Sequence, residues 1–462
     1  MSNFPALTHS LCPHCLCRIE ARRISENGSV FLEKSCPIHG NLQKVLLWRN
    51  SPRAYSEWNR ITNGRTGDSP DSVPSYSSDC PLSCGICPEH KQDTCTAIIE
   101  VTRQCNMHCP VCFADSGTKP HEDPEKETIA RMLQSLMNRG GTYPVQFSGG
   151  EPTLRDDLPE IVASARNMGY DHVQINTNGI RLAQDTDYGR ALRDAGATVV
   201  FLQFDGLTDD VYVRIRGTRL LEIKQTAIER CAELKLGIIL VPTLVRGIND
   251  SQIGSIIHFA KKWIPFVKGV HFQPMTYLGR YPEAPCNGRR ILIPDVLSAI
   301  ETQTQGELRV DHFVPPGCEE SHCSFSGLAV LGEDGKLIPT THFDLTQKTE
   351  QCCRVDPAQH SRNYVRSRWK YSASELTEID SKIRSMPECG CKTPHENLFE
   401  RARSHSLCIS GMAFQDAWSI DLERLQRCCV HVVTPDGKLI PFCAYYMTSS
   451  QRQRLHPAYS ER

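Results

Sequence analysis

The sequence predicts an α/β fold whose centre is a parallel sheet of six β/α repeats, closed or partly closed into a barrel. Two observations carry this prediction. From residue 97 onward, strand-like segments rich in β-branched residues alternate with segments of helical periodicity. Polar and glycine-rich turns follow the strand-like segments, where the chemistry of such folds collects. Cysteine-rich segments on either side predict a metal-binding ribbon at the N-terminus and an α+β region near the C-terminus.

The barrel is assigned to residues 97–300. Its six predicted strands are residues 97–101, 144–148, 172–177, 199–205, 237–245 and 270–275. The segments between them include the helical patterns at residues 126–140 and 158–169. Regular alternation of this kind places consecutive strands side by side and helices on the outside of the sheet.

Composition excludes several classes of protein. The 462 residues include 52 basic and 53 acidic side chains and no long Lys/Arg block, so the charge predicts no nucleic-acid partner. The longest apolar run, residues 237–245, is far shorter than the roughly 18 to 20 residues that span a bilayer. The first residues lack the basic start and apolar core of a secretion signal. We therefore expect a cytoplasmic protein without a transmembrane segment.

Twenty-three cysteines are the anomaly in this composition. In a reducing cytosol, tight clusters of thiols favour metal ligation over disulfides. The first cluster lies in a predicted module of residues 1–50, where two ligand pairs suit one tetrahedral site: Cys12, Cys15, Cys36 and His39. Zinc and a single rubredoxin-like iron both fit this spacing, and Cys17 is an alternative to His39. Residues 51–79, rich in Ser, Pro, Gly and Asp, are predicted to be a linker.

Two further clusters share the spacing C-x3-C-x2-C. Residues 80–96 hold four thiols that can close an iron–sulfur cluster completely: Cys80, Cys84, Cys87 and Cys95. Cys105, Cys109 and Cys112 follow the first predicted strand and therefore lie at the barrel mouth. Three thiolates leave one metal position for another ligand.

The turn "FSGGEPTL" at residues 147–154 follows the second predicted strand. Gly149 and Gly150 allow the backbone to approach a ligand closely, and Glu151 offers a charge that can pair with an ammonium group. Alone this turn is a weak signal. Together with the three cysteines after the preceding strand it becomes a strong one.

These residues together resemble the radical S-adenosylmethionine (SAM) enzymes, which have a partial (β/α)6 TIM-like barrel. The resemblance implies that Cys105, Cys109 and Cys112 hold three irons of a [4Fe–4S] cluster and that the amine and carboxylate of SAM chelate the fourth. Reductive cleavage of SAM then normally releases a 5′-deoxyadenosyl radical. Flavodoxin or ferredoxin is the electron donor that the resemblance implies.

The same resemblance assigns the cofactor contacts. Gly149, Gly150 and Glu151 should hold the methionine amine, and Phe113 should face the adenine. Candidates for the ribose or carboxylate contacts are Asn178, Gln203, Asp205 and Thr243. Four residues at or just beyond the sixth strand are placed to touch substrate: His271, Gln273, Tyr277 and Arg280.

A narrower likeness covers residues 10 to 450. In their order, "CPHC…CPIHG", "CPLSCGICPEHKQDTC", "EVTRQCNMHCPVCFADSG", "HFQPMTYLGR" and "FQDAWSIDLERLQRCCVHVVTPDGKLIPFCAYY" are similar to the subgroup of archaeal tetraether lipid synthases and class D methylases of 7,8-dihydro-6-hydroxymethylpterin. Members of this subgroup form carbon–carbon bonds and carry auxiliary clusters. Such a cluster is expected in the segment 80–96 and another in a domain of residues 301–450, followed by a tail at 451–462.

The C-terminal region repeats a strand–DGKLIP–strand pattern at residues 327–346 and 429–448, which predicts two hairpins with Asp-Gly turns. The predicted ligands of the C-terminal cluster are Cys318, Cys323, Cys429 and Cys443, with Cys408 and Cys428 as substitutes. Cys231 is expected to be a buried apolar residue. No role is assigned to Cys286. Three roles remain open for Cys352, Cys353, Cys389 and Cys391: metal ligation, substrate binding, or none beyond that of ordinary loop thiols.

The leading functional prediction is radical methylation or alkylation of a small molecule such as a pterin, or of lipid tails. The lack of a clear amphipathic basic helix favours a small soluble substrate. An alternative is transfer of the 3-amino-3-carboxypropyl group of SAM, possibly to trivalent arsenic held by the adjacent cysteines of "QCC" (351–353) or "RCC" (427–429), with release of methylthioadenosine. A third hypothesis, an iron–sulfur electron carrier, does not require the SAM pocket that the sequence predicts.

Overall fold

The computed structural model describes residues 4–59, 79–82, 84–86, 89–117, 122–343, 401–402 and 404–456. Most of the predicted linker and the end of the predicted tail lie outside these residues. So do five of the cysteines considered above: Cys87, Cys352, Cys353, Cys389 and Cys391.

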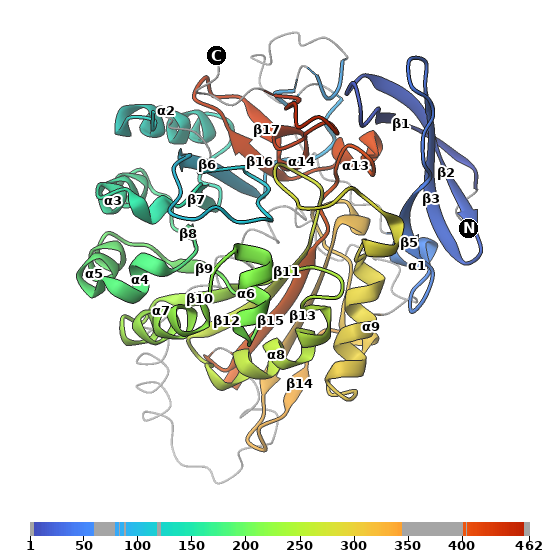
Figure 1. Ribbon diagram of the computed structural model, residues 1–462. Coiled ribbons are helices and arrows are strands. Elements are labelled where there is room, and N and C mark those ends of the chain that lie inside the picture. The colour runs from blue at the N-terminus through green and yellow to red at the C-terminus, as the bar shows by residue number, and fades with distance from the viewer. Residues whose placement is uncertain are drawn as a thin grey trace.

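The N-terminal module is an antiparallel sheet, drawn in blue in Figure 1. Its strands are β1 (Ala6–Leu11), β2 (Arg18–Glu26), β3 (Ser29–Cys36), β4 (Gly40–Asn41) and β5 (Val45–Arg49). They follow the order β1-β2-β3-β4, and β5 pairs with β3. The short helix α1 (Tyr55–Trp58) follows, and Trp48 and Trp58 bury their rings between this module and the rest of the chain. The predicted ribbon is therefore present.

The barrel strands run parallel in sequence order, as predicted. They are β6 (Thr96–Thr102), β7 (Val145–Gly149), β8 (Val173–Thr177), β9 (Val199–Gln203), β10 (Gly237–Val241) and β12 (Val267–Pro274). The predicted fifth strand is divided at Pro242, after which the short β11 (Thr243–Leu244) pairs with β12. Proline lacks the backbone N–H that a continuous ladder needs.

Helices cover the outer face of this sheet (Figure 1). They are α2 (Lys126–Met137), α3 (Leu158–Asn167), α4 (Ile180–Gln184), α5 (Thr186–Asp194), α6 (Asp209–Arg216), α7 (Leu221–Glu233), α8 (Ile253–Lys262) and α9 (Ile293–Gln303). In α2 the buried apolar residues are Ile129, Met132, Leu133 and Leu136, the three- and four-residue spacing of one helix face. This face and the apolar strands form the main core.

The C-terminal strands extend both edges of the same sheet. They are β13 (Ser324–Leu331), β14 (Leu337–Pro339), β15 (Ser406–Met412), β16 (Val430–Val433) and β17 (Leu439–Pro441), with the short helices α13 (Leu422–Leu425) and α14 (Phe442–Tyr445). Strand β15 pairs in parallel with β12, and β16 pairs in parallel with β6. The sheet therefore continues across the predicted boundary at residue 300.

Both predicted hairpins are confirmed. Strand β13 pairs antiparallel with β14, and β16 pairs antiparallel with β17. Each turn contains a glycine, Gly335 or Gly437, with a φ of +77°. That left-handed conformation is the reason for the Asp-Gly pair in both copies of the pattern.

The N-terminal ribbon docks on residues 416–423 through buried polar contacts. Lys34 donates to the Leu11 carbonyl at 2.7 Å and to the Ala417 carbonyl at 2.8 Å. Thr8 donates to the Asp421 carboxylate at 2.7 Å. In the same segment, Asp416 forms a bidentate ion pair with Arg290 at 2.8 and 3.0 Å, and Asp416 is fully buried.

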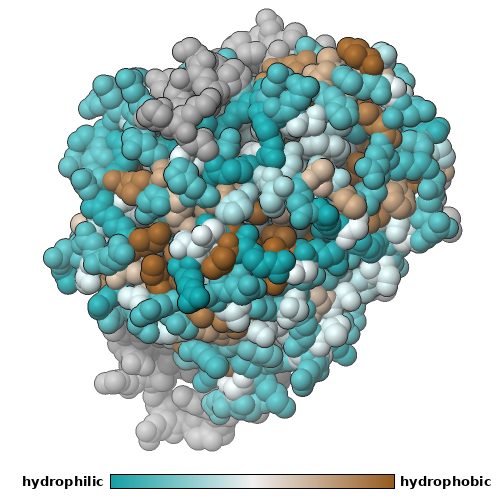
Figure 2. All heavy atoms as spheres, in the orientation of Figure 1, coloured by the Kyte–Doolittle hydropathy of each residue, from teal (hydrophilic) through white to brown (hydrophobic). Residues whose placement is uncertain are grey.

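The surface is mainly hydrophilic on the face drawn in Figure 2, with hydrophobic side chains in small groups near the left and the centre of the view. None of the helices in the described part of the chain is long and apolar enough to cross a membrane.

Asp416→Asn should destabilise the protein by about 3 to 5 kcal/mol, because Arg290 would lose its buried counter-charge. The measurement is chemical unfolding followed by circular dichroism. Asp187→Asn is the matched control, since Asp187 pairs with Arg190 on the surface. An equal response of the two variants would show that the Arg290–Asp416 pair does not hold this part of the fold.

Candidate active site

The three-cysteine loop follows β6 and lies against a cavity of about 610 Å³ inside the barrel. Cys105, Cys109 and Cys112 all line this cavity. Burial, with contributions from Glu151 and the other two cysteines, raises the pKa of the Cys105 thiol to about 12. Burial also raises the pKa of Cys109. Thiols in this setting become thiolates when a metal cation binds between them, so their chemistry fits an iron cluster.

Arginine side chains fix the backbone of this loop. Arg280 donates to the Cys109 carbonyl at 2.7 Å, and Arg216 donates to the Val111 carbonyl at 3.0 Å. The backbones of Cys112 and Arg280 also exchange hydrogen bonds of 2.9 and 2.8 Å. Arg280, predicted to touch substrate, therefore holds the cysteine loop.

Gly149 and Gly150 allow two backbone segments to meet. A Cβ atom on Gly149 would lie 1.9 Å from the Thr102 carbonyl oxygen, and one on Gly150 would lie 2.1 Å from the Gln104 carbonyl oxygen. The Gly150 N–H donates to Thr102 at 2.8 Å, and the Glu151 N–H donates to Gln104 at 2.9 Å. Only glycine fits at either position, and the contact sets Glu151 beside the segment that leads to Cys105.

Glu151 is a buried acceptor, with 1% of its surface exposed. Its carboxylate accepts hydrogen bonds from the Thr153 hydroxyl at 2.6 Å, the Thr177 hydroxyl at 2.6 Å and the Asn178 backbone at 2.7 Å. Within the described residues, no Lys or Arg lies within ion-pair distance of it. A buried carboxylate held in this way, at the edge of a cavity, suits a ligand ammonium group.

The other predicted SAM contacts divide into two groups. Phe113, Asn178, Gln203 and Thr243 line the cavity with the glycine turn. Asp205 does not; its carboxylate binds Arg216 at 2.7 Å through both oxygens. Arg216 lines the cavity and also donates to the Thr243 hydroxyl at 2.8 Å. Asp205 therefore fixes the position of the Arg216 cation at the cavity.

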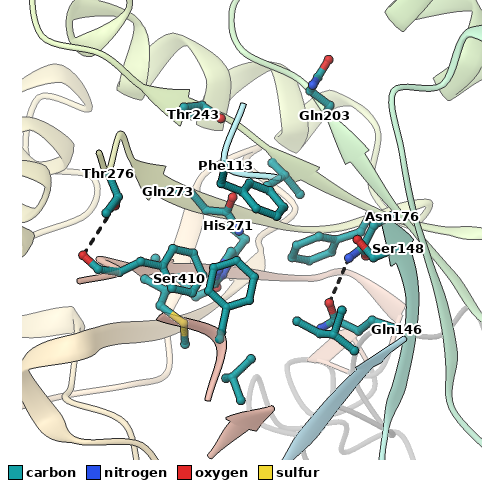
Figure 3. A pocket seen from close by; sticks show the side chains of 18 of the residues that line it. Phe113, Gln146, Ser148, Asn176, Gln203, Thr243, His271, Gln273, Thr276 and Ser410 are labelled. Carbon is teal, nitrogen blue, oxygen red and sulfur yellow. Dashed lines mark hydrogen bonds between the residues drawn. The ribbon is translucent and has the colours of Figure 1, made fainter. Parts of the chain in front are cut away.

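The wall of the cavity is rich in carboxamides and hydroxyls (Figure 3). The polar residues that line it come from neighbouring strands: Gln146, Ser148, Asn176, Gln203, Thr243, His271, Gln273 and Ser410. Asn176 donates to the Gln146 side chain at 3.0 Å. Aromatic rings complete the lining: Phe113, Phe201, Phe325, Phe414 and Phe442. Of the residues predicted to touch substrate, His271 and Gln273 reach the cavity and Tyr277 does not.

A second group of thiols opens into the same cavity. The sulfur atoms of Cys95, Cys318 and Cys429 lie within 4.8 Å of one another and are buried. The structure joins Cys95 to Cys318 by a disulfide, with Cα atoms 7.3 Å apart. Disulfides usually span no more than about 6.8 Å, so the wide spacing and the third thiol suit ligands of one metal centre. Cys95 and Cys429 line the cavity.

This arrangement differs from the predicted grouping, which placed Cys95 with Cys80, Cys84 and Cys87. Strand pairing is the reason: Cys95 precedes β6, Cys429 precedes β16, and the Cys95 N–H donates to the Cys429 carbonyl at 2.8 Å. Cys80 stays with Cys84, whose hydrogen bond lowers the pKa of the Cys80 thiol.

The remaining predicted ligands form a looser set. Burial raises the pKa of Cys428 to about 12, and Cys323 adds to this shift. Burial also raises the pKa of Cys443, with contributions from Cys428 and Cys323. These three thiols therefore lie in one region, and Cys429 borders it, because Cys428 and Cys323 contribute to the raised pKa of Cys429 as well. Cys408 lines the cavity from β15, and Cys231 is buried in the core, as predicted.

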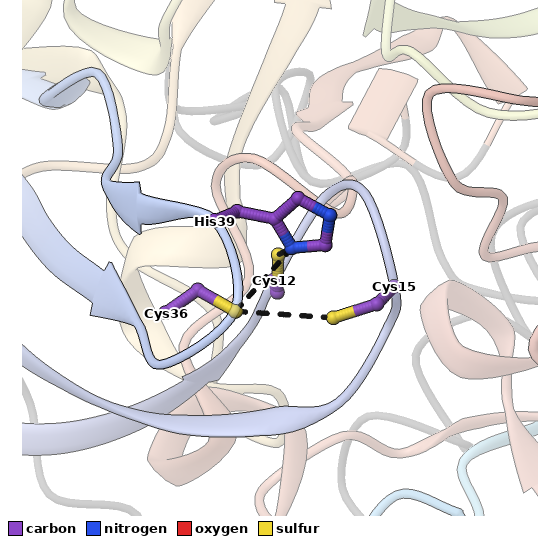
Figure 4. Close-up of side chains that lie close together, drawn as sticks. All are labelled: Cys12, Cys15, Cys36 and His39. Carbon is purple, nitrogen blue, oxygen red and sulfur yellow. Dashed lines mark hydrogen bonds between the residues drawn. The ribbon is translucent and has the colours of Figure 1, made fainter.

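The ribbon ligands converge as the sequence predicts (Figure 4). The His39 Nδ1 atom lies 3.5 Å from the sulfurs of Cys12 and Cys36, and the sulfurs of Cys15 and Cys36 are 3.9 Å apart. Bonds of about 2.3 Å to a central zinc would separate tetrahedral ligands by about 3.8 Å. Burial raises the pKa of Cys12 to about 11, which a bound cation would reverse. The exposed Cys17 is not part of the group.

Comparison with known proteins identifies the family. A model of the radical SAM superfamily matches residues 99–260, and a model of the HMPTM N-terminal zinc ribbon domain matches residues 4–49. The 7,8-dihydro-6-hydroxymethylpterin dimethyltransferase of Methanocaldococcus jannaschii is 36% identical over 498 aligned residues, which cover 98% of this chain and 95% of that protein. The chain belongs to the radical SAM superfamily. It is an iron–sulfur enzyme of the family that contains this dimethyltransferase.

Other proteins are similar to only part of this chain. A GTP 3′,8-cyclase of Listeria monocytogenes is 33% identical over 190 residues, 39% of this chain and 55% of that protein. The solved structure of Streptococcus suis SuiB bound to S-adenosylmethionine covers 46% of the chain, with 14% identity and a TM-score of 0.40.

Several residues of the site were not predicted from the sequence. Lys224, fully buried on α7, donates to the Asn178 carbonyl and to Gln203 at 3.2 Å, and burial lowers its pKa to about 8. Its helix position gives no sign of this role. Gln146 and Ser148, by contrast, alternate with buried Phe147 on β7, and polar residues at every second position of an apolar strand indicate an inward polar wall.

Gly150→Ala should prevent assembly of the radical SAM cluster, because its Cβ would collide with the backbone before Cys105. After anaerobic reconstitution, the variant should contain less iron and sulfide than the wild type, by the amount that one [4Fe–4S] cluster holds. Gly288→Ala is the control, since its Cβ would meet no atom closer than 3.8 Å. Full iron content in Gly150→Ala would contradict the packing role of this glycine.

Cys36→Ser should remove the metal of the ribbon, because three ligands hold zinc much more weakly than four. Metal analysis of the purified protein is the measurement. Cys17→Ser should keep the metal, since its thiol lies outside the group. Equal metal loss in both variants would show that Cys17 is a ligand.

Proposed function

We propose that this radical SAM enzyme methylates a carbon of a pterin, with 7,8-dihydro-6-hydroxymethylpterin as the first candidate. The observation that carries the proposal is the carboxamide-rich cavity beside the three-cysteine loop. A pterin offers hydrogen-bond donors and acceptors around a flat ring, and amide groups can satisfy both kinds. The near full-length similarity to a dimethyltransferase of that pterin supports the same substrate.

Lipid tails would be a poorer match. A binding site for an alkyl chain must leave no unsatisfied polar group beside it. Gln146, Ser148 and Asn176 occupy one wall, and His271 and Gln273 occupy another. Placing hydrocarbon between these walls would cost free energy at each polar side chain.

The three cysteines after β6 are the proposed ligands of a [4Fe–4S] cluster, which, with SAM bound, supplies reductive cleavage of the sulfonium to a 5′-deoxyadenosyl radical. Glu151 receives the methionine ammonium, and the backbone of Gly149 and Gly150 lies against it. Phe113 covers the adenine side. Asn178, Gln203 and Thr243 contact the ribose or the carboxylate, and Asp205 acts on the same ligand by orienting Arg216.

The outer thiols are proposed to hold further metal. Cys95, Cys318 and Cys429 are the proposed ligands of an auxiliary cluster that faces the cavity. Cys323, Cys428 and Cys443 are the proposed core of a second one, and Cys80 and Cys84 remain candidates for either. Zinc is the proposed metal of the ribbon. A cytoplasmic location and reduction by flavodoxin or ferredoxin complete the proposal.

Transfer of the 3-amino-3-carboxypropyl group is the weaker alternative. Neither the family models nor the relatives named above favour it. The adjacent thiols of Cys428 and Cys429 also face different partners. Cys428 donates to the Val430 carbonyl at 3.3 Å, whereas Cys429 lies with Cys95 and Cys318. A single arsenic atom would need both sulfurs free and side by side.

The test uses the anaerobically reconstituted full chain, SAM, a chemical reductant and pterin deuterated on its ring and side-chain carbons. We expect 5′-deoxyadenosine that carries deuterium from the pterin, together with a methylated pterin when a one-carbon donor is present. Mass spectrometry measures both. Cys109→Ala should abolish deuterium transfer, because the cluster would lose a ligand, while Cys286→Ala should not.

Two outcomes would contradict this proposal. Enzymatic methylthioadenosine would support aminocarboxypropyl transfer instead. Deuterium transfer from lipid substrates but not from the pterin would place lipid tails in the cavity.

A further inference from the structure

The superfamily match covers only some of the residues that line the cavity. The superfamily match covers residues 99–260, which include the cysteine loop, the glycine turn and Gln203. Strands β12 and β15 lie beyond that match, and they contribute His271, Gln273 and Ser410 to the cavity. Residues that recognise the substrate are expected on the part that the superfamily match does not include.

His271 lies deeper in the barrel than the proposed SAM contacts at its mouth. Thr243 pairs with Gln273 at the carboxyl end of β12, and His271 is two residues further into the barrel. Phe201 of β9 lies beside it, with ring centroids 5.5 Å apart. The imidazole therefore borders the inner part of the cavity, beyond the end that the cysteine loop lines.

Ser410 fixes the imidazole. His271 and Ser410 are register partners on the parallel strands β12 and β15, and the His271 Nδ1 atom lies 2.9 Å from the Ser410 hydroxyl. Burial lowers the pKa of His271 to about 4, so the ring is neutral at neutral pH. With Nδ1 bound to Ser410, the second ring nitrogen Nε2 is left for a ligand.

The opposite wall presents a second set of hydrogen-bonding groups. Gln174 donates to Asn176 at 2.6 Å, and Asn176 donates to Gln146 at 3.0 Å. The side-chain oxygen of Gln146 accepts the hydrogen bond from Asn176. The amide N–H groups of Gln146 are therefore the donors that this series of hydrogen bonds offers to a ligand. Figure 3 shows Gln146, Asn176 and Ser148 on one side and His271 and Ser410 on the other.

We propose that His271, oriented by Ser410, hydrogen-bonds the ring of the heterocyclic substrate and determines which ring the cavity accepts. The inference rests on the proposed function for the identity of that ring. A flat ring between the two walls would meet Gln146 at one edge and His271 at the other, with Phe201 beside it. His271 is the specificity-determining contact, and Ser410 is a positioning residue.

Equilibrium dialysis with 7,8-dihydro-6-hydroxymethylpterin and SAM, under anaerobic conditions, tests this assignment in the reconstituted full chain. His271→Phe should raise the Kd of the pterin about tenfold or more, because the cavity would lose a hydrogen bond. Ser410→Ala should raise it about threefold, and Ser410→Thr, which keeps the hydroxyl, should restore most of the affinity. Circular dichroism spectra and iron contents that match the wild type should show that all three variants fold and take up iron.

His258→Gln and Ser255→Ala are matched controls on helix α8, outside the cavity. Kd values for His271→Phe and Ser410→Ala within twofold of the wild type would overturn the role of His271 while leaving the proposed function intact. Failure of the wild type itself to bind the pterin would overturn the proposed function and, with it, the ligand assigned to His271.

Discussion

The close approach of two backbone segments is the constraint on which the rest of the site depends. Residues Thr102 to Gln104 leave β6 and pass so close to Gly149 and Gly150 that no Cβ atom fits between them. This contact brings together a loop of three thiols and a carboxylate, Glu151, that come from different strands. Every hydrogen bond around Glu151 then follows from the position of the turn. Gly149 and Gly150 are needed mainly because a side chain at either position would clash with the backbone of residues 102–104. The same lack of a side chain leaves their backbone accessible to a ligand.

Charge reinforces that geometry. Arg216 and Arg280 direct guanidinium groups at carbonyls of the cysteine loop, and Asp205 holds Arg216 from behind. These hydrogen bonds fix the backbone of the loop, and the Arg216 guanidinium favours the thiolate form of Cys109. Lys224, buried under Asn178, adds a cation to the same region. A site with fixed charges needs little reorganisation when an anionic cluster is inserted.

The sequence predicted what depends on near neighbours in the chain. The six barrel strands, both hairpins and the ribbon ligands follow from periodicity, Asp-Gly turns and two-residue spacings. The partners of Cys95 could not be found in this way, because they depend on the pairing of β6 with β16. The same holds for Ser410, which reaches His271 only because β15 pairs with β12. Asp205 was recognised as a polar strand end, but its burial against Arg216 is a property of the packed barrel.

The pairing of β6 with β16 also has a consequence for biosynthesis. Cys95, Cys318 and Cys429 are spread over most of the chain, so their site does not exist until the ribosome has released residue 429. The ribbon ligands, all within the first 39 residues, are available almost at once. The ribbon ligands can therefore come together while most of the chain is still to be made, whereas Cys95 and Cys318 must wait for Cys429. Because Cys95 and Cys429 both line the cavity, this part of its wall is complete only when β16 has paired with β6.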